Sequence, residues 1–128
     1  MSKAQIIKVI KENKSFLISS HINPEGDAIG SELALASLLA RLNKKVCIVN
    51  EDTNKQLNFL AGEDAIVNRA RKKLKFDVAI VVDCPVISRV GNVERLVKSS
   101  KILINIDHHI SNDRFGDINW VDDKVSCT

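Results

Sequence analysis

The sequence predicts an α/β protein in which a doubly wound, mainly parallel sheet is flanked by helices. Short apolar segments typical of strands alternate with amphipathic segments typical of helices, and this order favours a parallel sheet. Residues 77–82 contain a continuous apolar run, as expected for a strand that is buried on both faces. The 128 residues, 45% hydrophobic and 27% charged, suit one globular domain.

The first half of the chain is predicted to form a helix, a strand, a second helix and a second strand. The apolar stripe of Ile6, Ile7, Val9 and Ile10 predicts an amphipathic first helix, and Pro24 and Gly26 predict a loop after the first strand. A strand, a helix and a second strand in this order imply parallel strands joined by a right-handed crossover. The expected elements are a helix at 3–13, a strand at 15–20, a loop at 21–26, a helix at 27–42 and a strand at 46–50.

The second half has a less regular start. We expect short helices around 56–60 and 64–73, and then the buried strand at 77–82. The pattern of residues 87–99 favours a helix despite Gly91 near its start. Two further apolar segments, 102–106 and 118–121, predict the last strands.

Charge and cysteine content exclude several classes of protein. The formal net charge is +3, a mild excess that fits solvated helix faces and does not by itself establish an anionic partner. The three cysteines show no metal-binding or disulfide spacing, and no signal peptide precedes them, so we expect a reducing, cytoplasmic location. No stretch approaches the roughly twenty apolar residues that cross a bilayer, so we expect no membrane partner.

Residues capable of metal chemistry follow three of the predicted strands. In parallel sheets, ligands bind beyond the carboxyl ends of the strands, and these ends lie along one edge. Imidazoles and carboxylates in such number exceed the needs of one divalent ion and fit two ions that share a bridging carboxylate. The residues are His21, Glu25 and Asp27 after the first strand, Asp83 after the buried strand, and Asp107, His108 and His109 after the strand at 102–106.

Each of these residues also has a structural interpretation. Asp83 alone fits a helix cap or a turn, His21 a hydrogen-bonded loop residue, and residues 107–109 a polar turn. Their convergence on one edge favours a metal centre. The helix that starts near Asp27 points its free amides at the same crevice, which suits a phosphate, whereas Gly30 also fits simple helix packing.

Three segments resemble the motifs of the DHH phosphoesterases. Residues 21–31, HINPEGDAIGS, resemble the first motif, HxxPDGDAxGS; Asp83 and Cys84 match the second; and residues 106–109, IDHH, match the motif that names the family. Residues 115–122 and 126–128 resemble the nanoRNase subgroup. Members of that subgroup degrade short oligoribonucleotides and dephosphorylate 3′-phosphoadenosine 5′-phosphate.

The resemblance implies a role for each motif residue. It assigns one metal ion to His21, Glu25 and Asp83 and a second to Asp27, Asp83 and His108, with Asp83 bridging two Mn²⁺ ions. It implies a catalytic set of Asp83, His108, His109 and Asp107, in which Asp107 orients its neighbours. His109, Gly30 and Ser31 are assigned to the substrate phosphate. A water held between the ions would attack phosphorus.

Two features depart from the family pattern. Glu25 stands where the first motif has Asp, which keeps the carboxylate but adds a methylene. The fourth motif, with a further aspartate for the second metal, and the smaller DHHA1 substrate domain are expected beyond Thr128. Residues 1–128 are therefore expected to be the N-terminal part of a DHH domain with a weakened second metal site. Asp117, Asp122 and Asp123 match turn residues instead of ligands.

We expect a metal-dependent phosphoesterase acting on short RNA or nucleotide phosphates. The same motifs serve pyrophosphatases, single-strand exonucleases and cyclic dinucleotide phosphodiesterases. Two non-catalytic interpretations also fit the residues: a module that binds metal or nucleotide without turnover, and an α/β nucleotide-binding domain without metals. The sequence leaves homodimerisation open.

Overall fold

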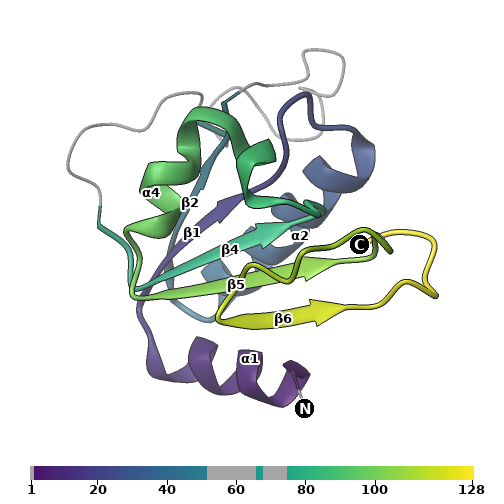
Figure 1. Cartoon of the computed structure of the whole chain (residues 1–128). Coiled ribbons are helices and arrows are strands. Elements are labelled where there is room, and N and C mark those ends of the chain that lie inside the picture. Colours follow the sequence, from purple (N-terminus) through teal and green to yellow (C-terminus); the bar gives the residue numbers. More distant parts are fainter. Residues whose placement is uncertain (1, 52–65, 68–74) are drawn as a thin grey trace.

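A computed structural model describes residues 2–51, 66–67 and 75–128, and it shows a six-stranded sheet in the order β3-β2-β1-β4-β5-β6 (Figure 1). Every pair of neighbouring strands is parallel, so the predicted doubly wound α/β class is confirmed. The elements are α1 (Ser2–Glu12), β1 (Ser15–Ser19), α2 (Gly26–Arg41), β2 (Lys45–Val49), β3 (Ile66–Val67), β4 (Val78–Val82), the 3₁₀ helix η2 (Ile87–Val93), α4 (Glu94–Lys98), β5 (Ile102–Asp107) and β6 (Ile118–Val121).

The central strands are buried on both faces. All five residues of β4 are buried, and in the register Ile18 of β1 lies beside Ile80 of β4, which lies beside Ile104 of β5. Successive side chains of a strand point to opposite faces. Ile18 and Ile80 therefore pack in one core cluster, whereas Leu17 and Val81 pack in another.

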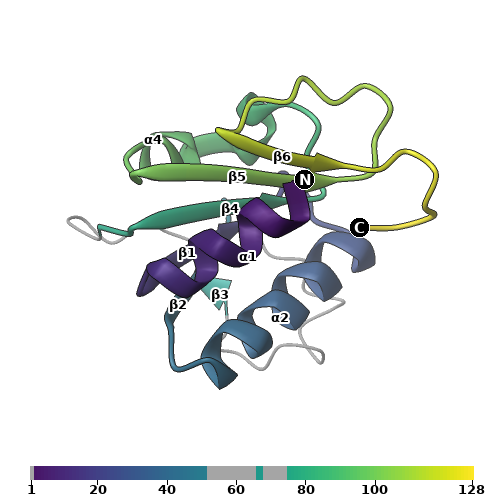
Figure 2. The same cartoon turned by 90° about the horizontal axis from the view of Figure 1, so that it is seen from below.

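Helices α1 and α2 cover one face of the sheet, and α4 lies on the other (Figure 2). Helix α1 buries Ile6, Val9 and Ile10 of the stripe that predicted it, whereas Ile7 is exposed. The sixteen-residue α2 is the crossover between β1 and β2. Asn43, with a φ of 58°, follows its C-terminus, where a left-handed residue commonly ends a helix.

The predicted helix at 87–99 is wrong in its first half. Residues 87–93, labelled η2, are two short 3₁₀ segments on either side of a kink at Gly91, and only Glu94–Lys98 are α-helical. Gly91 has a φ of 68° and a ψ of −136°, which no α-helix accommodates. The Glu51 side chain lies against this glycine, and its Oε1 accepts a hydrogen bond of 2.9 Å from the Asn92 amide. A contact with the end of β2 thus interrupts the helix.

The prediction for residues 64–73 is also wrong where the structure describes them. Ile66 and Val67 form β3, which pairs with Ile48 and Val49 of β2, because β-branched residues at a sheet edge are favoured when a partner strand is available. The rest of that predicted helix, and the one at 56–60, lie outside the described residues. The remaining predicted helices and strands agree with the structure to within two residues at each end.

The strand order reverses between β1 and β4. The chain passes outward from β1 through β2 to β3 and then returns to β4 and passes outward the other way. In doubly wound sheets, the carboxyl ends of the strands on either side of such a reversal open a crevice where ligands bind. His21 follows β1 and Asp83 follows β4, so both lie at this point. None of the described helices is long and apolar enough to cross a bilayer.

Candidate metal centre

Four predicted side chains converge at the crevice between β1 and β4. The Nε2 of His108 lies 3.4 Å from Oδ2 of Asp27 and 3.4 Å from Oδ1 of Asp83. The Nε2 of His21 lies 3.7 Å from the other carboxylate oxygen of Asp83. Asp83 therefore lies in the middle, with one oxygen toward each histidine.

The two separations of 3.4 Å at His108 suit ligands of one cation better than direct ion pairs. Hydrogen bonds from N–H to oxygen are commonly about 2.7–3.2 Å long, and the distances at Asp83 and Asp27 exceed that range. Two ligand atoms that are each about 2.1 Å from one ion are about 3.0–3.4 Å from each other. Imidazole nitrogens mixed with carboxylate oxygens are a donor set that divalent transition metals accept.

Asp83 is held in a strained conformation. Its φ of 52° lies in the left-handed region, and its amide bonds to the Ile106 carbonyl at 3.0 Å. Such strain persists where surrounding structure fixes it, and it gathers at functional sites. Burial alone would raise the pKa of Asp83, but His21, Thr128 and the positive charges of His109 and His21 outweigh it and hold the pKa below its ordinary value.

His21 presents a defined nitrogen to Asp83. Its Nδ1 lies 2.6 Å from the Ile22 carbonyl, which can only accept, so Nδ1 carries the proton and Nε2 is directed at the carboxylate. A histidine that binds a metal commonly fixes its other nitrogen in this way. Pairing with Asp83 raises the pKa of His21, although partial burial works against it.

Asp107 and His109 form a hydrogen-bonded pair beside this group. The Asp107 Oδ1 accepts a bond of 2.7 Å from His109 Nδ1, and its Oδ2 accepts one of 2.7 Å from Asn112 Nδ2. Asp83, Asp107, His108 and His109 have donor atoms within 4.8 Å of one another and could also hold a cation. Because both Asp107 oxygens already accept hydrogen bonds, its geometry fits orientation of His109 better than direct ligation.

Three further residues complete the surroundings. The Thr128 amide donates to both oxygens of Asp27 at 3.0 Å, and the Thr128 hydroxyl donates to Asp83 at 3.1 Å. Ser31 Oγ donates to Asp27 at 3.3 Å, and Asn112 also bonds Asn105 Oδ1 at 2.8 Å. Sequence reasoning did not single out Asn112, and it noted Thr128 only as part of a family segment. The one local feature that could have indicated Asn112 is that it is a polar residue soon after residues 107–109.

Comparison with known proteins identifies the family. The model of the DHH family, N-terminal domain, matches residues 15–128.

The chain belongs to the DHH family.

Its relatives include two bacterial enzymes named bifunctional oligoribonuclease and PAP phosphatase NrnA. The Thermus thermophilus protein is 33% identical over 125 residues, which are 98% of this chain and 36% of the relative. The Bacillus subtilis protein is 27% identical over 97% of this chain and 38% of the relative. A solved structure of an exopolyphosphatase-related protein from Bacteroides fragilis superposes with a TM-score of 0.88 at 25% identity, covering 98% of this chain and 40% of that one. The chain thus spans about two fifths of the proteins that it resembles.

Two residues of the DHH first motif stand apart from the cluster. Glu25 is exposed just before α2, and within the described part of the chain no hydrogen bond or ion pair joins its carboxylate to the other predicted ligands. Gly30 is also exposed on α2, with open space where a Cβ would be. The structure therefore brings together His21, Asp27, Ser31, Asp83, Asp107, His108 and His109, but not Glu25 or Gly30.

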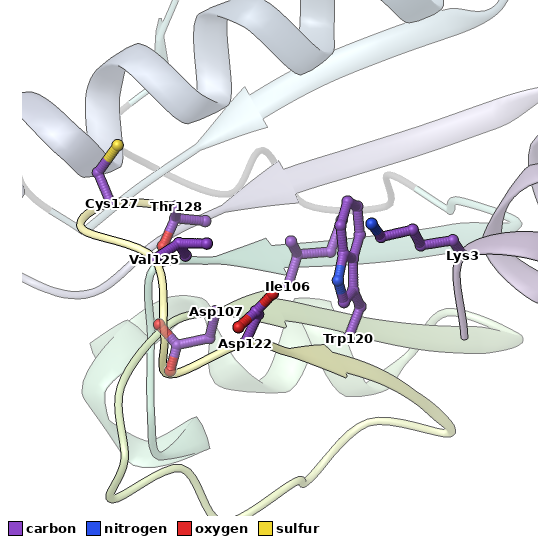
Figure 3. Close-up of a pocket in the computed structure, with 8 residues that line it drawn as sticks. All are labelled: Lys3, Ile106, Asp107, Trp120, Asp122, Val125, Cys127 and Thr128. Carbon is purple, nitrogen blue, oxygen red and sulfur yellow. The ribbon is translucent and has the colours of Figure 1, made fainter. Parts of the chain in front are cut away.

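A small cavity adjoins the DHH residues on the α1 side of the sheet. It measures about 190 Å³ and is lined by Asp107, Thr128, Trp120 and Lys3, among others. Figure 3 shows Lys3 and Trp120 at one end of the cavity and Cys127 and Thr128 at the other. Pockets for whole small-molecule ligands are commonly about 300–1,000 Å³, so this cavity alone is too small for a dinucleotide.

Proposed function

We propose that this chain is the metal-binding part of a DHH phosphoesterase that hydrolyses short oligoribonucleotides and nucleotide 3′-phosphates. The observation that carries the proposal is the position of Asp83 between His21 and His108. Asp27 lies near the same nitrogen of His108, Nε2, that faces Asp83. The names of the Thermus and Bacillus relatives support the two substrate classes. The DHHA1 domain, a cytoplasmic location and a homodimer belong to this proposal as properties of the whole protein.

The proposed ligand sets follow the motifs. His21, Glu25 and Asp83 would hold one Mn²⁺, and Asp27, Asp83 and His108 the other. When bound, two such ions lower the pKa of a water between them and neutralise charge on the phosphoryl oxygens. Glu25 is exposed, so its carboxylate would have to turn inward from the loop before α2.

The protein's own groups would orient the phosphate. His109 is fixed by Asp107, which is fixed in turn by Asn112, so the imidazole is preorganised. Because Asp107 accepts from Nδ1, a proton on Nε2 of His109 would be the one donated to a phosphoryl oxygen. The first turn of α2, with Ser31 following it, would add the favourable end of the helix dipole.

The test measures Mn²⁺-dependent release of mononucleotide from a labelled dinucleotide, and of phosphate from 3′-phosphoadenosine 5′-phosphate. This chain and a version extended through the next domain are assayed side by side, with Asp123→Asn as a charge-matched control away from the cluster. Turnover by the extended protein that Asp83→Asn abolishes supports the proposal. An extended protein that folds and binds Mn²⁺ yet turns over neither substrate would contradict it.

The second candidate is a metal-binding or nucleotide-binding module without turnover. Two observations favour it for this chain: the exposed Glu25, and the Thr128 amide bonded to both oxygens of Asp27. Titration with Mn²⁺ followed by calorimetry separates the cases. Binding without turnover, with turnover restored by Glu25→Asp in the extended protein, would attribute the loss to the longer side chain.

The same assay can test the other substrates of DHH enzymes. Pyrophosphate, single-stranded DNA and a cyclic dinucleotide test the remaining classes of the family. The Bacteroides neighbour, which is exopolyphosphatase-related, adds polyphosphate to that panel. Preference for one of these over the dinucleotide would reassign the substrate while keeping the metal centre.

A further inference from the structure

A second group of polar side chains is buried behind the metal centre. Glu32 of α2, Asn50 after β2, and Ser19 and Ser20 at the end of β1 are each no more than 1% exposed. We call these four residues the Glu32 network. The proposed hydrolysis assigns no role to any of the four.

Hydrogen bonds join three elements through this network. The Asn50 Nδ2 donates to Oε2 of Glu32 at 3.0 Å. The Asn50 Oδ1 accepts from the Ser20 amide at 3.1 Å and from the Ser19 hydroxyl at 3.2 Å. Helix α2 is therefore bonded, through the carboxyl end of β2, to the carboxyl end of β1.

The network lies between two segments of the metal centre. Ser20 immediately precedes His21, and its amide is the group that Asn50 holds. Asp27 lies on α2, little more than one helical turn before Glu32. Whatever fixes α2 against the end of β1 thus sets the position of His21 relative to Asp27.

The burial of the Glu32 carboxyl group costs free energy, so stability alone does not explain this residue. It continues the buried side of α2 formed by Ala28, Ile29 and Leu39, where an apolar residue would suit the core. Its Oε1 and the Ser20 Oγ have no hydrogen-bond partner within the described residues. Replacing buried polar pairs by apolar residues often leaves a protein as stable or more so. Packing therefore does not account for the carboxyl group at position 32, and we infer that it has another role.

We propose that Glu32, acting through Asn50, is a positioning residue. It holds His21 at the position relative to Asp27 that metal binding requires. The inference rests on the proposed function only in taking His21 and Asp27 as ligands. It predicts that the hydrogen bond to Asn50, and not the negative charge, is what matters. A glutamine at position 32 keeps an acceptor for Asn50 and adds a donor toward Ser20. Leucine keeps a similar side-chain volume but can neither accept nor donate a hydrogen bond.

The experiment compares Glu32→Gln with Glu32→Leu in this chain. Mn²⁺ affinity is measured by calorimetry, and stability by urea unfolding in the presence of a chelator. The leucine variant leaves the buried Asn50 Nδ2 without its acceptor, so it is expected to be less stable than the parent. It is also expected to bind Mn²⁺ about tenfold to a hundredfold more weakly, as is common when a group that orients a ligand is lost. The glutamine variant is expected to bind as the parent does. Glu32→Met, with a more flexible side chain, replaces the leucine variant if that fails to fold.

A metal-independent readout separates this inference from the proposed function. The ring resonances of His21 in the metal-free protein should move in the leucine variant and return in the glutamine variant, with His109 as an internal reference. If the parent binds no Mn²⁺, the proposed function fails, while the ring resonances still decide the positioning role. Unchanged affinity and unmoved His21 resonances in the leucine variant would overturn the inference, as would a glutamine variant as impaired as the leucine one.

Discussion

Asp83 adopts a backbone conformation that few residues other than glycine tolerate, and asparagine is one that does. Its carboxylate faces His21 through one oxygen and His108 through the other, so it links these two histidines of the cluster. The backbone preference and the charge can therefore be separated by one substitution.

Asp83→Asn should keep the fold and lose the metal. Asparagine accepts the φ of 52° without added strain, so the urea midpoint should stay close to that of the parent. Loss of the shared carboxylate should weaken Mn²⁺ binding by at least about a hundredfold. Calorimetry checks the affinity, and Asp123→Asn is the control. Parent-like affinity in Asp83→Asn would rule out a shared carboxylate at this position.

Glu32 should make stability depend on pH. Burial is the main cause that raises its pKa from 4.5 to about 7, against the opposing effect of the hydrogen bond from Asn50. Because the folded pKa lies above the unfolded one, the stabilisation is complete below pH 4.5 and is lost as pH rises toward 7. The loss is on the order of 3 kcal/mol, at about 1.4 kcal/mol for each pKa unit.

Glu32→Gln has no proton to lose and should not show this loss. Its unfolding free energy relative to the parent should therefore rise between pH 4.5 and 7 and then level off. Urea unfolding of the metal-free proteins across this range checks the trend. Glu12→Gln removes an exposed carboxyl and serves as the control. Parallel pH curves for the parent and Glu32→Gln would show that Glu32 titrates normally.

At the scale of elements, the kink within η2 depends on one glycine, Gly91. A Cβ at Gly91 would lie 2.6 Å from the carboxyl carbon of Glu51, and the φ of 68° would strain any other residue. Gly30, in the first half of α2, offers the opposite case, because nothing lies within 4 Å of its Cβ position. The two glycines form a matched pair.

Gly91→Ala should destabilise the chain by about 1–3 kcal/mol, because the conformation and the contact with Glu51 both resist a side chain. Gly30→Ala should stabilise it by about 0.5–1 kcal/mol through helix propensity. Thermal unfolding of both variants provides the comparison. Equal effects at the two positions would contradict the break that the structure shows at Gly91.

At the scale of the whole molecule, the metal centre joins segments that are far apart in sequence. His21 and Asp27, Asp83, and His108 follow β1, β4 and β5, which the strand order places side by side. A cation bound by all three segments has no comparable site in the unfolded chain. Metal binding should therefore appear as folding free energy.

Mn²⁺ should stabilise the chain in proportion to its affinity. At a free concentration about a hundredfold above the dissociation constant, the gain is about 2.7 kcal/mol. Urea unfolding at increasing Mn²⁺ measures it, with Mg²⁺ as a comparison and Asp83→Asn as the control. A parent protein whose midpoint does not move with Mn²⁺ would show that the three segments hold no ion.

The sequence by itself determined the α/β class, nearly all the described strands, and the residues that gather at one sheet edge. Apolar runs, helical stripes and strand-end polar residues are local patterns, and a parallel sheet turns them into a shared edge. Only the tertiary structure decided the break at Gly91, the strand Ile66–Val67 and the bonds from Thr128 to Asp27. Each depends on a partner distant in the chain: Glu51 lies 41 residues from Asn92, and Asp27 lies 101 residues from Thr128. Local propensity carries no information about such partners, and the fold alone brings them into contact.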